Sequence, residues 1–358
     1  MSKVLGTSAD IQARLEPLTE DGGRLLLENG TYQIKDPIEI NSLSTKLAGE
    51  VWCCNTDPNG VFESNFGTKL RLVGTDHPAI TVAPHNMVGG NVICDLGIQG
   101  DIKGMDSRRV WNSEHPEYSA GIHFSGCRVD QAEFSKISFC GLSSAICATG
   151  TSEIDACVFE KLNMDGCCVG VYFAPLYSYY ARFRHCVFGD TPSYAFYASC
   201  EKMHNLELTD SHFVRNCGAM PGGNTSDAAA VYFNGISTST IRNCLFDAPG
   251  TFWYYDDDAT QNSQRQPSKV PVVALRVTGR RNRIIDNVFI HSSAESIVLS
   301  GNENVLLNNI VDGDVVVEGD GNMICNLVFT KPEARLILQK NATNTQITGV
   351  PEDRIVRL

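Results

Sequence analysis

The chain has 358 residues, a net charge of −12, 42% hydrophobic residues and 14 cysteines. Such an acidic chain argues against a nucleic-acid partner, because phosphate binding needs a basic surface. No segment has the length and hydropathy of a signal peptide or a membrane span, so we expect a cytoplasmic protein that does not associate with membranes.

The cysteines are scattered through apolar segments, as at Cys94, Cys140 and Cys157. The adjacent pairs Cys53-Cys54 and Cys167-Cys168 lack the spacing of metal ligands. Because no secretion signal is present, we interpret the cysteines as reduced residues of the core. The sequence therefore predicts neither a bound metal nor a cofactor.

The N-terminal segment predicts a short helix. Ser8 is a suitable N-cap for a helix over residues 9–15, in which Ile11 and Leu15 share one face. Such a helix would cover the open end of a solenoid, whose first strand otherwise has an unpaired edge. We assign residues 1–35 to this cap and to the first strands, which turn at Asn29-Gly30.

A repeated unit of two strands then runs through the chain. Short alternating strands are each followed by a polar turn and a second apolar stretch, and Asn or Asp recurs in or beside these stretches. The first strands lie at residues 120–124, 169–173, 229–233 and 273–277, the second stretches at 134–139, 183–188, 241–246 and 284–289, and the polar residues are Asp210, Asn243, Asn287, Asn309 and Asn326.

Self-similarity at roughly 20–50 residues is typical of solenoids, in which each coil buries its apolar face against its neighbours. Connections between parallel strands are right-handed with very few exceptions. We therefore predict an all-β protein, a right-handed parallel β-helix with an N-terminal capping helix. It forms a single domain over residues 1–358, with coils from 36 to 350 and a C-terminal tail from 351 to 358.

Three insertions interrupt the coils, near residues 101–118, 217–227 and 248–269. Insertions in a solenoid form loops, often on a functional face. Two of them combine aromatic and charged residues, which suits sugar binding because rings pack on C–H faces and carboxylates accept hydroxyl hydrogen bonds. An oligomer contact or a solvated loop is the structural alternative. The candidates for substrate binding are Arg109, Trp111, His115, Trp253, Tyr254 and Asp257.

The acidic run Asp256 to Asp258 also suggests calcium, but three consecutive acids do not easily converge on one ion. For catalysis, two acids at strand ends are the best candidates. Asp190 follows the stretch 183–188 and Glu201 follows the next strand, and glycosidic cleavage needs a pair of carboxylates. As structural alternatives, both are turn residues.

The distance between these two acids is an objection. About six strand residues separate their loops, or roughly 20 Å of extended chain. One bond is flanked by acids only ~5–9.5 Å apart. Either the chain bends sharply or Asp190 of one subunit meets Glu201 of another, and we prefer the second alternative, in a cyclic oligomer.

The N-terminal segments Ile11–Leu15, Gly22-Gly23 and Asn29–Tyr32 resemble those of the pectate-lyase-like β-helix superfamily. The order of coils and insertions, with Val298–Asn302 and Leu338–Thr343, resembles the inulin fructotransferases and the difructose-dianhydride hydrolases. That resemblance implies a catalytic Asp and Glu on neighbouring loops, at Asp190 and Glu201 here. It also implies a homotrimer with its active site between subunits.

We therefore expect an enzyme that cleaves or rearranges a fructofuranosyl linkage in an oligosaccharide or a cyclic disaccharide. Glu201 would act as acid and base, and Asp190 would stabilise the oxocarbenium-like centre or orient the attacking hydroxyl. A cytoplasmic location favours hydrolysis of a small imported substrate.

Two alternatives stay open. A polysaccharide lyase or uronate epimerase could use Arg182 and Arg184 with Tyr179 and Tyr180, and Arg182 is also a candidate for substrate binding. A non-catalytic spike or adhesin would suit the lean C-terminal coils, but not the three insertions.

Overall fold

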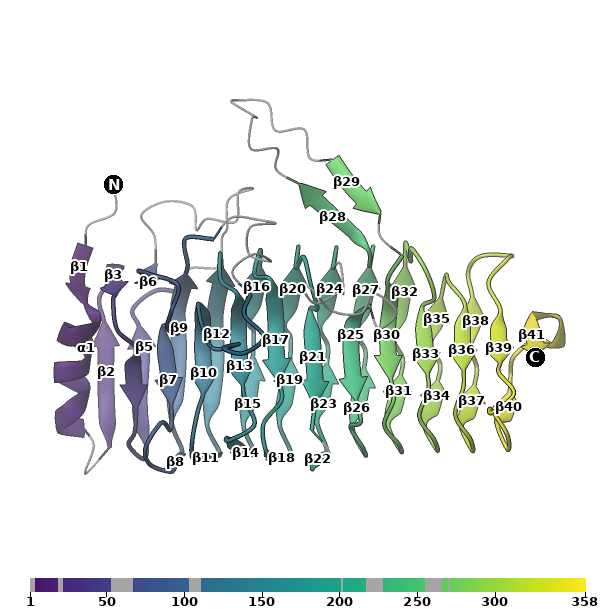
Figure 1. The fold of residues 1–358 in the computed structure, drawn as a ribbon, viewed down its shortest axis with the longest axis horizontal. Coiled ribbons are helices and arrows are strands. Elements are labelled where there is room, and N and C mark those ends of the chain that lie inside the picture. Colours follow the sequence, from purple (N-terminus) through teal and green to yellow (C-terminus); the bar gives the residue numbers. More distant parts are fainter. Residues whose placement is uncertain are drawn as a thin grey trace. The chain divides into compact units, whose positions relative to one another are not determined.

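The computed structural model describes residues 4–18, 22–52, 67–102, 111–200, 202–216, 228–254, 266–269 and 271–358. The chain forms two compact units, Met1–Arg182 and Phe183–Leu358. In each unit successive coils place parallel strands side by side (Figure 1). The predicted fold, a right-handed parallel β-helix, is confirmed. The expectation of a single domain stays a prediction.

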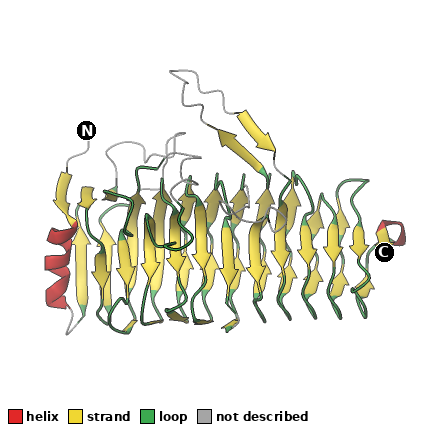
Figure 2. Cartoon of the chain, viewed as in Figure 1, coloured by secondary structure: helices red, strands yellow, loops and turns green. Residues whose placement is uncertain are grey.

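The predicted N-terminal helix is present as α1 (Ser8–Leu15), followed by the 3-10 turn η1 (Glu16–Leu18). Figure 2 shows it at the end of the stack of unit 1. The N-cap is Thr7 and not Ser8: Thr7 Oγ1 accepts a bond from the Asp10 amide, and the Asp10 carboxylate accepts one from the Thr7 amide at 2.7 Å. Ser8 Oγ instead accepts from the amides of residues 35 and 36, both at 3.3 Å, and so docks the helix.

We name the strands of a coil, in chain order, the first, second and third strands. In unit 1 the first strands are β4 (Ile38–Ile40), β7 (Ile80–Val82), β10 (Ala120–Phe124), β13 (Ser144–Ala148) and β17 (Val169–Phe173). A small sheet joins β8 (Val88–Gly89), β11 (Arg128–Asp130), β14 (Glu153–Asp155) and β18 (Tyr177–Tyr179).

The second strands of unit 1 are β2 (Gly23–Leu27), β5 (Thr45–Gly49), the first halves of β9 (Val92–Gln99) and β12 (Glu133–Cys140), and β15 (Val158–Glu160). The third strands are β1 (Val4–Thr7), β3 (Gly30–Ile34), β6 (Thr68–Leu72), the second halves of β9 and β12, and β16 (Asn163–Asp165).

In unit 2 the first strands are β21 (Phe196–Ser199), β25 (Ala229–Asn234), β30 (Val273–Val277), β33 (Ile297–Leu299), β36 (Val315–Val317), β39 (Leu336–Leu338) and β41 (Ile355–Arg357). The second strands are β23 (Glu207–Thr209), β26 (Thr240–Arg242), β31 (Arg283–Ile285), β34 (Val305–Leu307), β37 (Met323–Cys325) and β40 (Gln346–Thr348). The strand β19 (Arg182–Arg184) contains the division between the units.

The third strands of unit 2 are β20 (Val187–Gly189), β24 (His212–Val214), β27 (Leu245–Asp247), β32 (Val288–Ile290), β35 (Ile310–Val311) and β38 (Val328–Phe329). Outside these lines lie β22 (Met203–His204), the antiparallel pair β28 (Thr251–Tyr254) and β29 (Gln266–Lys269) in the third predicted insertion, and the 3-10 turn η4 (Glu352–Arg354). The tail packs on the body, because β41 pairs with β39.

The predicted second stretches differ from expectation in one respect, because each contains a corner. His185, Asn243 and Asp286 adopt positive φ between 53° and 55°, and the chain passes there from a second strand to a third. Asn and Asp tolerate this left-handed conformation better than most residues. The sequence rule of two strands per coil is therefore corrected to three.

Buried ring stacks and amide ladders hold the coils together. The rings of Phe213, Phe246 and Phe289 stack at centroid distances of 4.9 Å and 4.4 Å in unit 2, and Phe134 stacks on Phe159 at 5.0 Å in unit 1. Two buried ladders of Asn residues continue unit 2 toward its C-terminal end. Their members are Asn282, Asn304 and Asn322 in one ladder, and Asn287 and Asn309 in the other.

Candidate functional site

A groove lies on the outer face of the second strands of unit 1. The register places Lys46 beside Val92 and Val92 beside Glu133, while Ser135 lies beside Glu160. Residues two apart on a strand point to the same face, so these side chains share the outer surface. The inner positions between them hold apolar residues such as Phe134, whose ring stacks in the core.

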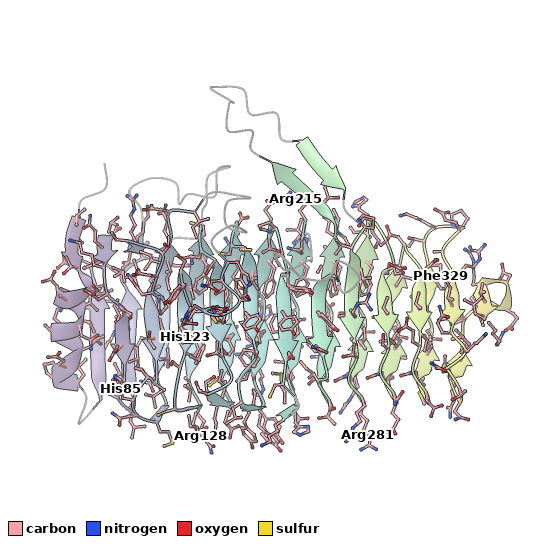
Figure 3. All side chains as sticks on the ribbon, in the orientation of Figure 1. His85, His123, Arg128, Arg215, Arg281 and Phe329 are labelled. Atoms are coloured by element: carbon pink, nitrogen blue, oxygen red, sulfur yellow. The ribbon has the colours of Figure 1, made fainter. Side chains whose placement is uncertain are left out.

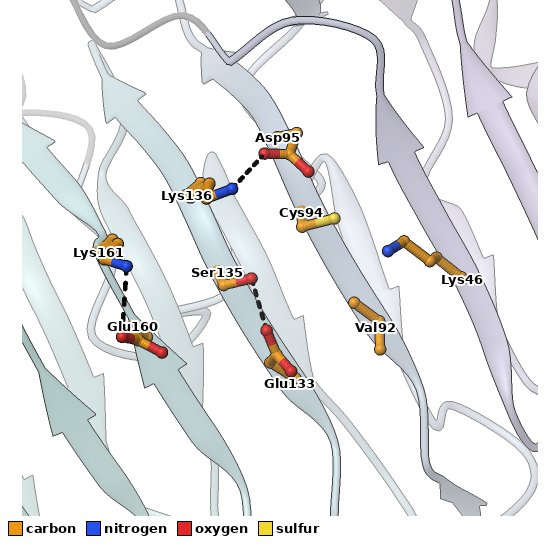
Figure 4. A pocket seen from close by; sticks show the side chains of 9 residues that line it. All are labelled: Lys46, Val92, Cys94, Asp95, Glu133, Ser135, Lys136, Glu160 and Lys161. Atoms are coloured by element: carbon orange, nitrogen blue, oxygen red, sulfur yellow. Dashed lines mark hydrogen bonds and ion pairs between the residues drawn. The ribbon is translucent and has the colours of Figure 1, made fainter.

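The groove has a volume of about 300 Å³ and is lined almost entirely by polar side chains (Figure 4). Three lysines, Lys46, Lys136 and Lys161, and three carboxylates, Asp95, Glu133 and Glu160, surround it. Val92, Cys94 and Ser135 complete the lining. This volume is at the lower end of the range for small-molecule sites, so the groove can hold a ligand of about one sugar ring.

Two of the lysines are paired with acids. Lys136 Nζ lies 3.5 Å from Asp95 Oδ1, and Lys161 Nζ lies 3.6 Å from Glu160 Oε1. Asp95, Lys136 and Lys161 all have positive φ, between 51° and 57°, and occupy the same corner of successive coils. The corner therefore presents one carboxylate followed by two ammonium groups along the groove.

The floor of the groove is chemically inert at neutral pH. Cys94 is 4% exposed, and burial raises the pKa of its thiol to about 11. Reactive cysteines have lowered pKa values and partial exposure. Cys94 is therefore an apolar floor residue and not a nucleophile.

A second charged site contains Asp190, one of the two predicted catalytic residues. Arg215 donates to both carboxylate oxygens of Asp190, from Nε to Oδ1 at 2.7 Å and from Nη2 to Oδ2 at 2.6 Å. Both residues have positive φ and directly follow third strands, β20 and β24, and Figure 3 shows Arg215 at this edge of unit 2. A bidentate guanidinium fixes the orientation of a carboxylate and uses it as an acceptor.

The row of charged residues that begins with Asp190 and Arg215 continues on the next coils. The Arg215 amide donates to the Asp247 carbonyl at 3.0 Å, and His291 Nδ1 lies 2.9 Å from Asp247 Oδ1. The side chain of Asp190 keeps 19% of its surface exposed. The edge of unit 2 thus carries an ordered row of charges, in which Asp190 is held in one orientation and stays accessible.

Several predicted site residues lie outside the described residues: Arg109, Glu201 and Asp257, together with the side chains of Trp253 and Tyr254. Asp190 and Glu201 flank β21, whose four residues span about 13 Å. The pairing of Asp190 with Glu201 therefore stays a prediction.

The described part of the first insertion lies over the first strands of unit 1. Trp111 meets the ring of Tyr172 on β17 edge-on, with centroids 5.3 Å apart. His115 stacks on Tyr118 at 4.5 Å, and its Nδ1 lies 3.1 Å from Glu117 Oε1. The two predicted sugar-binding residues therefore have different protein partners.

Two buried polar residues lie on this same sheet. His123 (Figure 3) is 7% exposed, its Nε2 lies 3.2 Å from Thr149 Oγ1, and its register partner is Cys147. Burial lowers the pKa of His123 to about 4, against the opposing effect of Glu117, and burial raises the pKa of Cys147 well above its usual value. Both are neutral at pH 7, which suits a structural role for His123.

Arg182, a candidate in two of the predicted sites, opens β19 and is exposed. It belongs to the second strands, while Trp111 contacts a first strand, so the two do not share a face. Tyr180 is 49% exposed and has positive φ, at 53°. The residues of the alternative lyase site are thus accessible at the surface.

Unit 2 also carries an apolar surface, which we call the apolar stripe. It consists of outward-facing residues of the third strands, namely Leu245, Val288, Ile310 and Val328, and of Val187, which His212 separates from Leu245 in the register. Val187, Ile310 and Val328 are 39%, 37% and 53% exposed. Contiguous exposed apolar side chains are typical of association surfaces.

The groove was not predicted from the sequence, although a signal exists. Glu133-Phe-Ser-Lys136 and Val158-Phe-Glu-Lys161 share the pattern of an inward Phe and a Lys at the corner. Aligning the coils on that pattern would have brought the outward residues together. Among the described residues there is no cluster of potential metal ligands, and no described helix is long and apolar enough to cross a membrane. All 11 described cysteines are unbridged.

No known family profile matches the chain, and no curated protein matches it. Several solved structures are similar to the chain. DFA-IIIase from Arthrobacter chlorophenolicus A6, without its lid and in complex with GF2, has a TM-score of 0.68 and 14% identity, covering 98% of this chain and 92% of its own. Its C387A mutant with DFA-III has a TM-score of 0.65 and 15% identity, over 97% and 91%. The Dettilon tailspike protein gp208 has a TM-score of 0.57 and 12% identity over 97% of this chain, which spans 64% of the tailspike. At these identities the likeness establishes a shared fold.

Proposed function

We propose that this protein is a carbohydrate-active enzyme that cleaves or rearranges a fructofuranosyl linkage in an oligosaccharide or a cyclic disaccharide. The observation that carries the proposal is the likeness to DFA-IIIase over nearly the whole of both chains, in structures that hold GF2 and DFA-III. The Dettilon tailspike covers this chain equally well, but only 64% of the tailspike is matched.

In this proposal Glu201 acts as acid and base, and Asp190 stabilises the positive charge of the oxocarbenium-like transition state or orients the attacking hydroxyl. The division of roles follows from the contacts of Asp190. A carboxylate that accepts two bonds from Arg215 is placed to hold negative charge and not to deliver a proton. The acid role therefore goes to Glu201.

The apolar stripe supports the further proposal of a homo-oligomer, a homotrimer as we predicted, in which Asp190 and Glu201 of different subunits form one site. Apolar outward residues on parallel strands suit side-to-side packing of coils. We also keep a cytoplasmic location as a proposal, because unbridged cysteines suit a reducing compartment.

The test is product analysis on fructans, difructose dianhydrides and uronates, with Glu201→Gln and Asp190→Asn. Each variant is expected to lower turnover of a fructosyl substrate by about 10²–10⁴-fold with unchanged folding. Glu333→Gln and Asp353→Asn, at exposed positions, are the matched controls. Wild-type turnover in either site variant would remove this assignment.

A non-catalytic spike is the second candidate, and the likeness to the Dettilon tailspike favours it. The two candidates give opposite results in the same screen. A spike binds a surface glycan without releasing product, whereas the proposed enzyme releases sugar from at least one fructosyl substrate.

A further inference from the structure

We propose that the groove on the second strands of unit 1 is a binding site for a monoanionic sugar, a sugar acid of about one ring. The inference does not depend on the proposed function, because the groove lies in unit 1 and contains neither Asp190 nor Glu201.

Ion pairs between lysines and carboxylates cancel most of the charge in the groove. Lys136 and Lys161 are neutralised by Asp95 and Glu160. Among the described residues, Lys46 has no carboxylate within ion-pair distance, and Glu133 has no cation; Glu133 accepts only a 2.8 Å bond from Ser135 Oγ. One ammonium and one carboxylate of the groove are therefore available to a ligand.

The available ammonium and carboxylate lie on opposite sides of β9. Val92 lies between them in the register, so Lys46 and Glu133 are two strands apart, about 9.5 Å at the backbone. Figure 4 shows the Lys46 ammonium directed toward Cys94 and Val92 of β9. A ligand above Val92 meets a cation on one side and a hydrogen-bond acceptor on the other.

These groups favour a hydroxylated carboxylate as the ligand. A carboxylate of the ligand would pair with Lys46, and a hydroxyl would donate to Glu133. Ser135, Glu160 and Lys161 add further partners for hydroxyl groups, which favours a polyhydroxylated molecule over a simple amino acid. A dianion such as phosphate is disfavoured, because the other cations are already paired and three carboxylates surround the groove. The volume of about 300 Å³ admits one ring.

The experiment is a calorimetric titration of the full chain with D-glucuronate, using D-glucose as the neutral match and inorganic phosphate as the anion control. We expect glucuronate to bind at least about tenfold more tightly than glucose or phosphate. Lys46→Met keeps the apolar stem of the side chain and should weaken glucuronate about tenfold, to the level of glucose. Lys340→Met, at an exposed position of unit 2, should leave binding unchanged.

Glu133→Met should weaken D-glucose, since it loses the carboxylate that accepts from a hydroxyl of the ligand. Equal binding of glucuronate and glucose, tighter binding of phosphate, or unchanged binding in Lys46→Met would overturn the proposal. If Lys46→Met fails to fold, Lys46→Gln takes its place, and the comparison of the three ligands on the unaltered protein still decides. A loss of turnover in the Glu201→Gln variant has no bearing on this titration, so the two proposals can fail separately.

Discussion

The groove of unit 1 and the apolar stripe of unit 2 are built on the same backbone plan and present opposite chemistry. Both consist of outward positions on parallel strands in register, above inward positions that hold stacked phenylalanines. In the groove the outward residues are Lys46, Glu133 and Glu160, whereas in the stripe they are valine, leucine and isoleucine. A parallel coil thus fixes its core with one half of its residues and leaves the other half free to specify a ligand or a partner.

The largest effect is expected in the inward half, where the two regions should respond alike. Phe159→Ala in unit 1 and Phe246→Ala in unit 2 each remove a fully buried, stacked ring. Each should lower the free energy of unfolding by about 3–5 kcal/mol in urea denaturation. A cost below about 1 kcal/mol in one unit only would break the claim that the cores are equivalent.

A pH effect is expected around His123 in unit 1, and His212 of unit 2, whose pKa is also lowered by burial, should give a change of the same sign. The folded-state pKa of His123, at about 4, lies below its unfolded value of about 6.5, so the unfolded state binds the extra proton first. Stability from neutral His123 is complete above pH 6.5 and is lost as the pH falls toward 4, with an upper limit of about 3 kcal/mol. Hydrogen exchange followed by mass spectrometry should show this loss around β10 and β13. His123→Gln should remove it, and its persistence in that variant would assign the effect to another group.

Breaking an amide ladder should lower the free energy of unfolding of unit 2. Asn309 Oδ1 accepts from the backbone and side-chain amides of Asn287, and Asn309 Nδ2 donates to the Ile284 carbonyl at 2.8 Å. Asn309→Ala leaves these buried groups without partners and should cost about 1–3 kcal/mol of unfolding free energy. Glu333→Ala, at an exposed position of the same unit, is the control and should cost less than about 0.5 kcal/mol.

The smallest effect on folding is expected in the outward half of unit 2. Val328, the most exposed member of the apolar stripe, is 53% exposed. Val328→Asp should leave the melting temperature nearly unchanged and weaken self-association by about tenfold or more, as measured by sedimentation at several concentrations. Lys340→Asp is a matched control at another exposed position of unit 2. An unchanged oligomeric state in Val328→Asp would show that the stripe is not an interface.

The sequence predicted the repeats well because period-two alternation reports directly which residues face a core. It could not locate the corners, because residues with no strong left-handed preference, such as Lys136 and Ala248, occupy some of them at positive φ. The neighbouring coil imposes that conformation: the Ala248 amide donates to the Ile290 carbonyl. Corners of this kind are set by register and not by local preference.

The candidate sites were harder to predict for the same reason. Asp190 could be selected as an acid at a strand end, but its partner Arg215 comes from the next coil, 25 residues later. The groove gathers residues from Lys46 to Lys161, whose proximity depends on coils of unequal length. Loop residues such as Trp111 could be selected because their insertion combines aromatic and charged residues. Outward strand residues such as Glu133 lie in segments whose composition is that of an ordinary strand.

The Asn ladder has a consequence for how such a chain can change in length. Asn304 and Asn322 are 18 residues apart, and Asn304 Oδ1 accepts from the Asn282 amide as Asn322 Oδ1 accepts from the Asn304 amide. A tandem duplication of that interval would insert a coil whose contacts above and below already exist. Genetic change can therefore lengthen this part of the molecule in whole-coil steps, without inventing a new fold at either junction.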